Sequence, residues 1–140
     1  MKVFTIGYQG KRFNQIADTL TTHRVDLVID VREIAWSRKP GFSKKKLSLA
    51  LAERGIAYVH EPRLGSPRPL RVSYRETNDW NTFIRGFRVY LQSQSPLLQD
   101  KVRELAAGRV CLLCFEAPAS ECHRSAVADA LRPDEHLVIS

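Results

Sequence analysis

Apolar positions fall along the chain in short runs, separated by longer stretches in which apolar and polar residues are mixed. Five runs are four to seven residues long and rich in Val, Ile, Leu and aromatic residues, as is typical of strands that are buried on both faces of a sheet. The pattern predicts strands over residues 3–6, 25–31, 56–60, 110–115 and 136–139.

Between these runs, apolar residues return every three or four positions, which is the period of a helix that buries one side. The first such stretch carries Phe13, Ile16 and Leu20 on one face. A second helix is expected after Ser43, a residue type that caps helix N-termini, and Gly55 is expected to end it.

The second half of the chain shows the strongest helical period, over residues 80–91. Residues 95–108 are predicted to form a separate helix, because Pro96 suits a first helical turn. Ser120 is the expected N-cap of a last helix. Residues 61–78 contain three prolines and one glycine, so they are predicted to form a long surface loop.

Strands that alternate with helices predict a parallel sheet, because each crossover helix connects two strands and covers a face of the sheet. The expected fold is a three-layer, Rossmann-like α/β domain with about five mainly parallel strands and helices on both faces. A chain of 140 residues with 44% apolar content suits one domain of this kind, assigned here to residues 1–140.

Composition predicts a cytoplasmic protein that is not embedded in a membrane. The first residues, MKVFTIGYQG, do not resemble a signal peptide, and no apolar stretch approaches the roughly 20 residues of a membrane span. Three cysteines are an odd number and too few for a disulfide scaffold, so Cys111, Cys114 and Cys122 are expected to be thiols. Nothing in the sequence indicates an oligomeric state.

The net charge of +7 is concentrated in one segment. Residues 32–75 hold eleven Lys or Arg against three Glu, a balance of +8 that leaves −1 for the rest of the chain. A positive segment attracts phosphate-bearing ligands, including nucleic acids, although a solvated surface is the alternative. Lys44, Lys45 and Lys46 fall in a first helical turn, where cations are unfavourable unless an anion binds there or the side chains bend into water.

Open parallel sheets bind ligands beyond the carboxyl ends of their strands, where the connecting loops meet. The loops after the first four expected strands are rich in glycine and polar residues, so they predict a binding site at this edge. Arg32, Ser37 and Arg38 are candidate contacts for an anionic substrate in these loops. Tyr8 and Tyr74 are candidates to stack on a base or a sugar.

The stretch CFEAPASECHR, residues 114–124, gathers two cysteines, two glutamates, a histidine and an arginine. With Ser120 as N-cap, Cys122 and His123 would lie in the first helical turn, where backbone N–H groups and the helix dipole attract anions. Arg124 would bind the anion and lower the pKa of the Cys122 thiol, which makes Cys122 a candidate catalytic residue and His123 and Arg124 candidate binding residues. The alternative is a purely structural helix start.

Two carboxylates are candidate general bases for such a site, Glu116 and Asp30, because each follows or closes a predicted strand. A charged Asp30 at the end of a buried strand requires a partner, so a structural pair with Arg32 or Arg124 is the alternative. The two roles are compatible.

No metal and no organic cofactor are expected. Cys111 and Cys114 are interpreted as buried strand residues, since a free cysteine behaves as a small apolar side chain. The chain also lacks G-x-G-x-x-G and G-x-x-x-x-G-K-[ST], the motifs of common dinucleotide and nucleotide sites.

Several short motifs occur in a fixed order along the chain: TIGYQG, DVR at residues 30–32, SRKPGF at 37–42, Leu64-Gly65 and CFE followed by CHR. In this combination the sequence resembles the bacterial and archaeal family catalogued as domain of unknown function 488 (DUF488). The resemblance spans nearly the whole chain. It implies a shared site and no known reaction.

Three functions fit these observations. The first is an enzyme that acts on a phosphate-containing small molecule, nucleotide or nucleic-acid component at the carboxyl edge of the sheet. The second is a nucleic-acid-binding module that uses the basic segment 32–75. The third is a thiol-based redox or sensor protein that uses Cys122 with Cys114.

Overall fold

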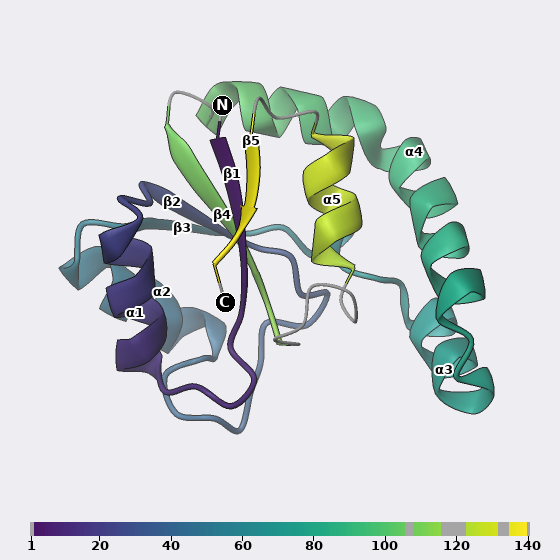
Figure 1. Cartoon of the computed structure of the whole chain (residues 1–140), viewed down its shortest axis with the longest axis horizontal. Helices are drawn as coiled ribbons and strands as arrows, with labels where there is room; N and C mark the ends of the chain where they lie inside the picture. The colour runs from purple at the N-terminus through teal and green to yellow at the C-terminus, as the bar shows by residue number, and fades with distance from the viewer. Residues whose placement is uncertain (1, 106–107, 116–122, 132–134, 140) are drawn as a thin grey trace.

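The computed structural model describes residues 2–105, 108–115, 123–131 and 135–139 of the 140-residue chain. One sheet of five strands forms its centre, and all neighbouring strands are parallel (Figure 1). The predicted α/β fold is thus confirmed. In spatial order β3-β2-β4-β1-β5, the strands are β1 (Lys2–Gly7), β2 (Leu27–Asp30), β3 (Ala57–His60), β4 (Arg109–Cys114) and β5 (Glu135–Val138).

Helices cover both faces of the sheet and give the predicted three layers (Figure 1). One face carries α1 (Phe13–Thr22) and α2 (Lys44–Glu53). The other carries α4 (Trp80–Leu105) and α5 (Arg124–Ala130), with α3 (Arg68–Thr77) packed on α4. A short 3-10 turn, η1 (Pro62–Leu64), lies between β3 and α3.

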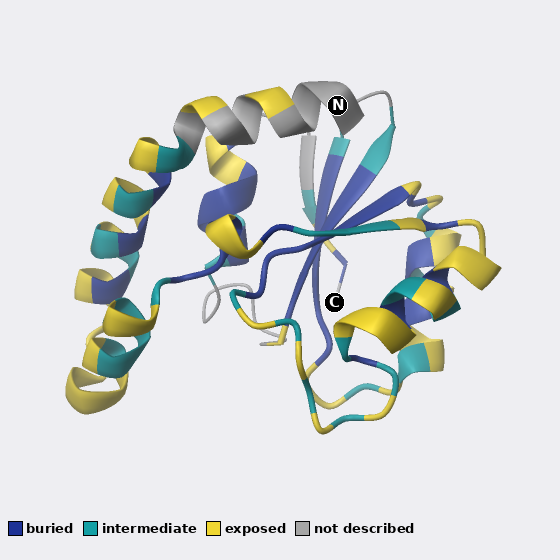
Figure 2. Cartoon of the chain, turned by 180° about the vertical axis from the view of Figure 1, so that it is seen from behind, coloured by how far each residue is buried: buried dark blue, intermediate teal, exposed yellow. Residues whose placement is uncertain are grey.

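Each face of the sheet has its own core, because side chains of a strand alternate between the two faces. Along β1, Phe4 and Ile6 belong to the core shared with α1 and α2, whereas Val3 belongs to the core shared with α4 and α5. Figure 2 shows the result, with the central strands largely dark blue between helices whose outer sides are yellow. This two-sided burial explains why the strands read as continuous apolar runs.

The order of the strands determines where a ligand can enter. The chain leaves β1 and β2 toward α1 and α2 on one face, but it leaves β4 toward α5 on the opposite face. Since β4 lies between β1 and β2, connections from neighbouring strands diverge at their carboxyl ends. Such a divergence opens a crevice beyond the sheet edge, the usual ligand site of open α/β folds.

The predicted long loop over residues 61–78 is wrong, because the segment contains η1 and the ten-residue helix α3. The prolines that suggested a loop lie at the starts of these helices. Pro67 is the N-cap of α3 and Pro69 lies in its first turn. A first-turn proline lacks only an N–H that would have no partner in the helix, so it favours the helix start.

The predicted separate helix over residues 95–108 is also wrong, because α4 continues through Pro96 to Leu105. A proline inside a helix removes one backbone hydrogen bond and crowds the preceding turn, at a cost of about 3 kcal/mol. The helix tolerates this and bends along its length (Figure 1), as expected when its apolar side follows a sheet. Among the described helices, none is both long and apolar enough to span a membrane.

Candidate ligand-binding site

A cavity of about 340 Å³ lies where the connections from β1, β2 and β4 diverge. We refer to it as the site cavity. Its lining comes from segments far apart in the sequence, including the end of each of these strands, α3 and the start of α5. The lining residues are Tyr8, Arg32, Glu33, Ile34, Trp36, Ser37, Ser66, Arg71, Cys114, Phe115 and His123.

A buried ion pair supports the inner part of the site cavity. Arg32 donates from Nε to Asp30 Oδ1 at 2.8 Å and from Nη2 to Asp30 Oδ2 at 2.6 Å. The Asp30 side chain is fully buried and that of Arg32 is 7% exposed. Burial alone would lower the pKa of the Arg32 guanidinium, but the hydrogen bonds and charge of Asp30 outweigh burial and raise it. The predicted structural pair of Asp30 is therefore formed with Arg32.

Further hydrogen bonds fix this pair. The Tyr58 hydroxyl donates to Asp30 Oδ2 at 2.5 Å, and burial followed by the bond to Asp30 raises the pKa of Tyr58. Arg32 Nη1 donates to the Tyr8 hydroxyl at 3.1 Å and to the Phe42 carbonyl at 2.7 Å. Asp30 is thus surrounded by donors and does not line the site cavity. This geometry favours a positioning role for Asp30, and its predicted role as general base has no support in the contacts.

Arg71 is a second cation in the site cavity, and the sequence analysis missed it. It donates from Nη2 to Glu33 Oε1 at 2.8 Å and from Nη1 to the Ser66 carbonyl. The side chains of Arg71 and Glu33 are 29% and 34% exposed. The signal was available in the sequence, since Pro67 and Pro69 at a helix start place Arg71 in the first turn of that helix.

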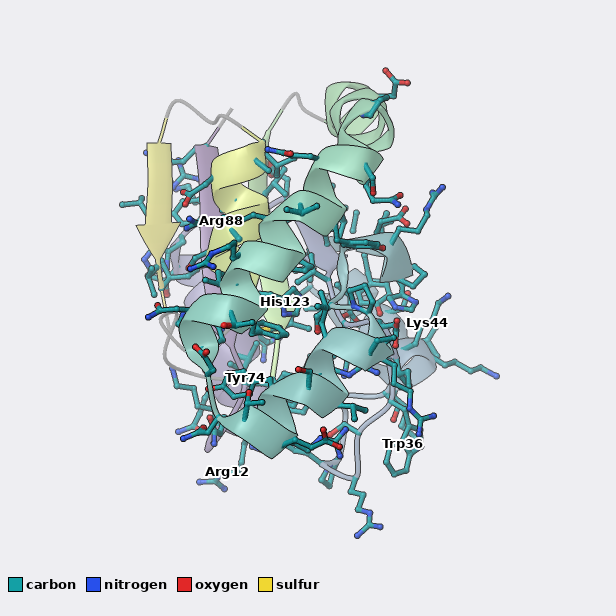
Figure 3. The ribbon with its side chains drawn as sticks, turned by 90° about the vertical axis from the view of Figure 1, so that its right-hand side faces the viewer. Arg12, Trp36, Lys44, Tyr74, Arg88 and His123 are labelled. Carbon is teal, nitrogen blue, oxygen red and sulfur yellow. The ribbon has the colours of Figure 1, made fainter. Side chains whose placement is uncertain are left out.

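His123 lines the site cavity as a neutral side chain. Its Nε2 donates to the Val31 carbonyl at 2.9 Å, because a carbonyl can only accept, so the second ring nitrogen Nδ1 carries the lone pair. Burial and then the charges of Arg124 and Arg71 lower the pKa of His123 to about 4, against the opposing bond to Val31. The ring also meets Phe87 of α4 edge-on, and Figure 3 shows His123 close to that helix.

Of the CHR motif the structure describes His123 and Arg124, and it places the start of α5 later than the predicted N-cap Ser120 would. α5 begins at Arg124, after His123, and is seven residues long. Arg124 is fully buried, donates from Nη1 to Cys114 Sγ at 3.1 Å and does not line the site cavity. Glu116, Ser120 and Cys122 lie outside the described residues, so their predicted roles stay predictions.

The expectation of three thiols is wrong for Cys114, which is disulfide-bonded. An odd number of cysteines requires one thiol and still leaves room for one bonded pair. Among the described cysteines Cys111 is a free thiol, and burial raises its pKa. The two residues lie on opposite faces of β4, Cys111 in the core under α1 and α2 and Cys114 in the core under α4 and α5.

The structure brings together Tyr8, Arg32, Ser37 and His123 of the predicted binding residues. It does not bring in Arg38, which is exposed outside the site cavity. Nor does it bring in Tyr74, whose ring packs edge-on against Trp80 and Phe83 between α3 and α4. Tyr74 therefore contributes to the packing of two helices. The sequence did not indicate this, because the segment around Tyr74 was expected to be a loop.

Three exposed apolar side chains at the site cavity were also missed. Ile34, Trp36 and Phe115 are 66%, 63% and 45% exposed. They follow the ends of β2 and β4 in segments without periodicity, where a sequence pattern does not distinguish a buried side chain from an exposed one.

A family model described as domain of unknown function DUF488 matches residues 12–131. The chain belongs to this family. A search of curated proteins finds no match, and a search of solved structures finds none either. In this DUF488 chain the matched range includes every lining residue of the site cavity except Tyr8, which follows β1.

The DUF488 domain has a second cavity, of about 450 Å³, beside the edge strand β3. Its lining is Lys44, Lys45, Ser48, Leu49, Tyr58 and His60. Tyr58 and His60 direct hydrogen bonds inward, to Asp30 and to the Arg32 carbonyl, so their rings connect this cavity to the network behind the site cavity. Among the described residues, no group of three Cys, His, Asp or Glu is placed to hold a metal ion.

Proposed function

We propose that this DUF488 protein is an enzyme that binds a phosphate-bearing small molecule in the site cavity and acts on it. One observation carries the proposal. Two arginines, Arg32 and Arg71, and the Tyr8 hydroxyl line one cavity at the point where the strand connections diverge. Guanidinium groups bind phosphate oxygens with well-defined geometry, and this edge of the sheet is the usual ligand site of such folds.

The contacts of Arg32 leave it donor capacity for a ligand. A guanidinium has five N–H donors. The hydrogen bonds to Asp30, Tyr8 and Phe42 use four of them in the described part of the chain. The Tyr8 oxygen accepts from Arg32, so its own proton is oriented away from that bond.

Arg71 supports the proposal in a different way, because its ion pair is weak enough to exchange. Its pair with Glu33 is about one-third exposed, and exposed pairs contribute only about 0–1 kcal/mol. A phosphate with two negative charges can replace Glu33 on Arg71 at little cost. Arg32, whose buried pair is expensive to break, would hold its position while Arg71 moves.

His123 is a candidate for proton transfer on a bound ligand, because it lines the site cavity and the bond to Val31 fixes its tautomer. Burial lowers its pKa to about 4, so the imidazole is neutral at neutral pH but is a weaker base than an exposed histidine. Cys122 and Glu116 stay candidate catalytic residues from the sequence alone.

Calorimetric titration with inorganic phosphate, ribose 5-phosphate and adenosine monophosphate tests the binding step. Replacing Arg71 by Gln should weaken binding roughly tenfold, the effect of losing one charge-assisted hydrogen bond. Arg75→Gln is the matched control, since Arg75 is exposed on the same helix and does not line the site cavity. Equal effects of the two changes, or no binding of any of these compounds, would contradict the proposal.

The catalytic step needs a separate measurement. Phosphorus NMR of ribose 5-phosphate and mononucleotides incubated with the protein should show new resonances, and His123→Gln should slow their appearance without abolishing ligand binding. Binding without any new resonance from the panel would leave a binding protein and refute an enzyme acting on these compounds.

Nucleic-acid binding is the second candidate, favoured by the lysines of α2. Lys44, Lys45 and Lys46 are exposed, and no ion pair of theirs occurs in the described residues. Lys44 extends away from the body in Figure 3. By contrast, Arg32, Arg54, Arg63 and Arg71 of the basic segment are each paired with a carboxylate.

A further inference from the structure

We propose that the phosphate-bearing ligand also carries a planar aromatic ring, as a nucleotide does, and that Trp36 and Phe115 receive this ring. The inference rests on the proposed function, since it names the class of ligand for the same cavity. It excludes sugar phosphates and inorganic phosphate as the preferred ligands.

The site cavity has two chemically different parts. Its inner part is polar and buried, with Tyr8, Arg32 and Ser66 at 2%, 7% and 5% exposure. Its outer part contains large apolar side chains beside the partly exposed pair of Arg71 and Glu33, and Trp36 and Phe115 there are 63% and 45% exposed. A ligand that fills both parts needs an anionic end and an apolar end.

The apolar rim is not a random feature of the surface. Six large apolar residues are prominently exposed among the described residues, and three of them, Ile34, Trp36 and Phe115, line this one cavity. Single exposed apolar residues are common and need no explanation, but a cluster beside a polar pocket marks a binding surface. Figure 3 shows Trp36 at the margin of the molecule, away from His123.

The arrangement of the rim favours a flat ring over an aliphatic group. Phe115 stands edge-on to Tyr8, with ring centroids 5.4 Å apart, and Tyr8 stacks on Phe42 at 4.3 Å. Aromatic surface therefore extends from the Tyr8 ring beside the inner donors to Phe115 at the rim. Aromatic side chains of this kind bind bases by stacking, which depends little on the identity of the base.

The chain offers a direct reporter for this contact. It contains two tryptophans, Trp36 at the rim and Trp80 in the packing between α3 and α4. Replacing Trp80 by Phe, which keeps a ring next to Tyr74 and Phe83, leaves Trp36 as the only indole. A ring that stacks on Trp36 should quench its fluorescence, whereas a phosphate bound only at Arg32 and Arg71 should not.

The experiment compares adenosine monophosphate, uridine monophosphate and phenyl phosphate with ribose 5-phosphate and inorganic phosphate, by calorimetry and by Trp36 fluorescence in the Trp80→Phe protein. The aromatic phosphates should bind roughly tenfold or more tightly than ribose 5-phosphate, the effect of stacking one ring. Trp36→Ala should remove this preference and leave the affinity for ribose 5-phosphate unchanged. Leu49→Ala, at an equally exposed residue outside the site cavity, should change neither.

Three results would overturn the inference, and they differ in whether the proposed function is overturned as well. If all these phosphates bind with equal affinity and Trp36→Ala changes none of these affinities, the inferred preference for an aromatic ligand is wrong and the proposed function stands. If none of them binds, both are wrong. A change of oligomeric state in Trp36→Ala, measured by light scattering and without any preference for aromatic phosphates, would identify the rim as a protein contact and also overturn the inference.

Discussion

Asp30 and Asp18 each form an ion pair with an arginine, and the two pairs differ in how far they are buried. The Arg32 to Asp30 pair measures 2.6 Å with side chains 7% and 0% exposed, and the Arg54 to Asp18 pair 2.7 Å with side chains 32% and 71% exposed. The distances are nearly equal. The energetic consequences of losing the aspartate charge should therefore differ chiefly because of solvent exposure, and the bond from Tyr58 to Asp30 adds to the difference.

Asp30→Asn should lower the free energy of unfolding by about 3–5 kcal/mol, because it leaves the Arg32 charge buried without a counter-ion. Asp18→Asn should lower it by about 0–1 kcal/mol. Urea denaturation of both variants measures the difference. Equal losses would show that the Asp30 pair is as well solvated as the one on the surface.

At the scale of helices and strands, the basic segment 32–75 does not act as a unit. Three of its four lysines lie on α2 over one face of the sheet, and its last three arginines lie on α3, which packs on α4 over the other face. The charge counted along the sequence is therefore larger than the charge on any one surface. Within the basic segment, the lysines at the start of α2 are the largest group without an ion pair in the described residues.

Replacing Lys44, Lys45 and Lys46 together by Gln should weaken retention of single-stranded or duplex DNA and reduce the salt dependence of log Kd. The same change should leave stability equal or raise it slightly, because it removes cations from a helix N-terminus. Arg75, Arg85 and Arg88 to Gln, which remove the same charge from exposed positions on α3 and α4, serve as the control. Equal losses of DNA affinity in both triple variants would show that the three lysines have no specific role in binding.

The helices also show which elements could be predicted from the sequence and which could not. Apolar periodicity located α1, α2 and the first half of α4, since one buried face dictates the pattern. Proline misled it twice and in opposite directions. Pro67 and Pro69 start α3, and Pro96 lies inside α4, because the effect of a proline depends on which backbone N–H it replaces.

At the scale of the whole molecule, the alternation of strands and helices was enough to predict a parallel sheet, and it directed attention to the carboxyl edge where the site cavity lies. It was not enough to predict the strand order. Only the insertion of β4 between β1 and β2 places Cys114 and Phe115 beside Tyr8 and Arg32. Non-local pairing of this kind leaves no periodic signal in a sequence. Trp36 was missed because its segment has no periodicity, and Arg71 was missed because Pro67 and Pro69 were interpreted as marks of a loop.

His123 ties the stability of the whole fold to pH. Its pKa falls from 6.5 to about 4 on folding, so between these values the unfolded chain binds a proton that the folded chain does not. Stability should therefore fall as the pH decreases from about 6.5 to 4, by on the order of 2–3 kcal/mol from this residue. Unfolding free energies measured from pH 4 to 7 should show a shallower slope in His123→Gln, and parallel curves would contradict the buried neutral imidazole.

α3 contributes Arg71 to the site cavity although it has no fully buried residue of its own and packs chiefly on α4. Helices with so little burial open locally at a small free energy, so their amides exchange with solvent long before the sheet does. A ligand that ties Arg71 to the sheet edge would make that opening costlier. Hydrogen exchange by mass spectrometry should then show slower exchange over residues 68–77 on adding adenosine monophosphate, with β1 and β4 unchanged, so that this weakly buried helix becomes a sensitive indicator of occupancy.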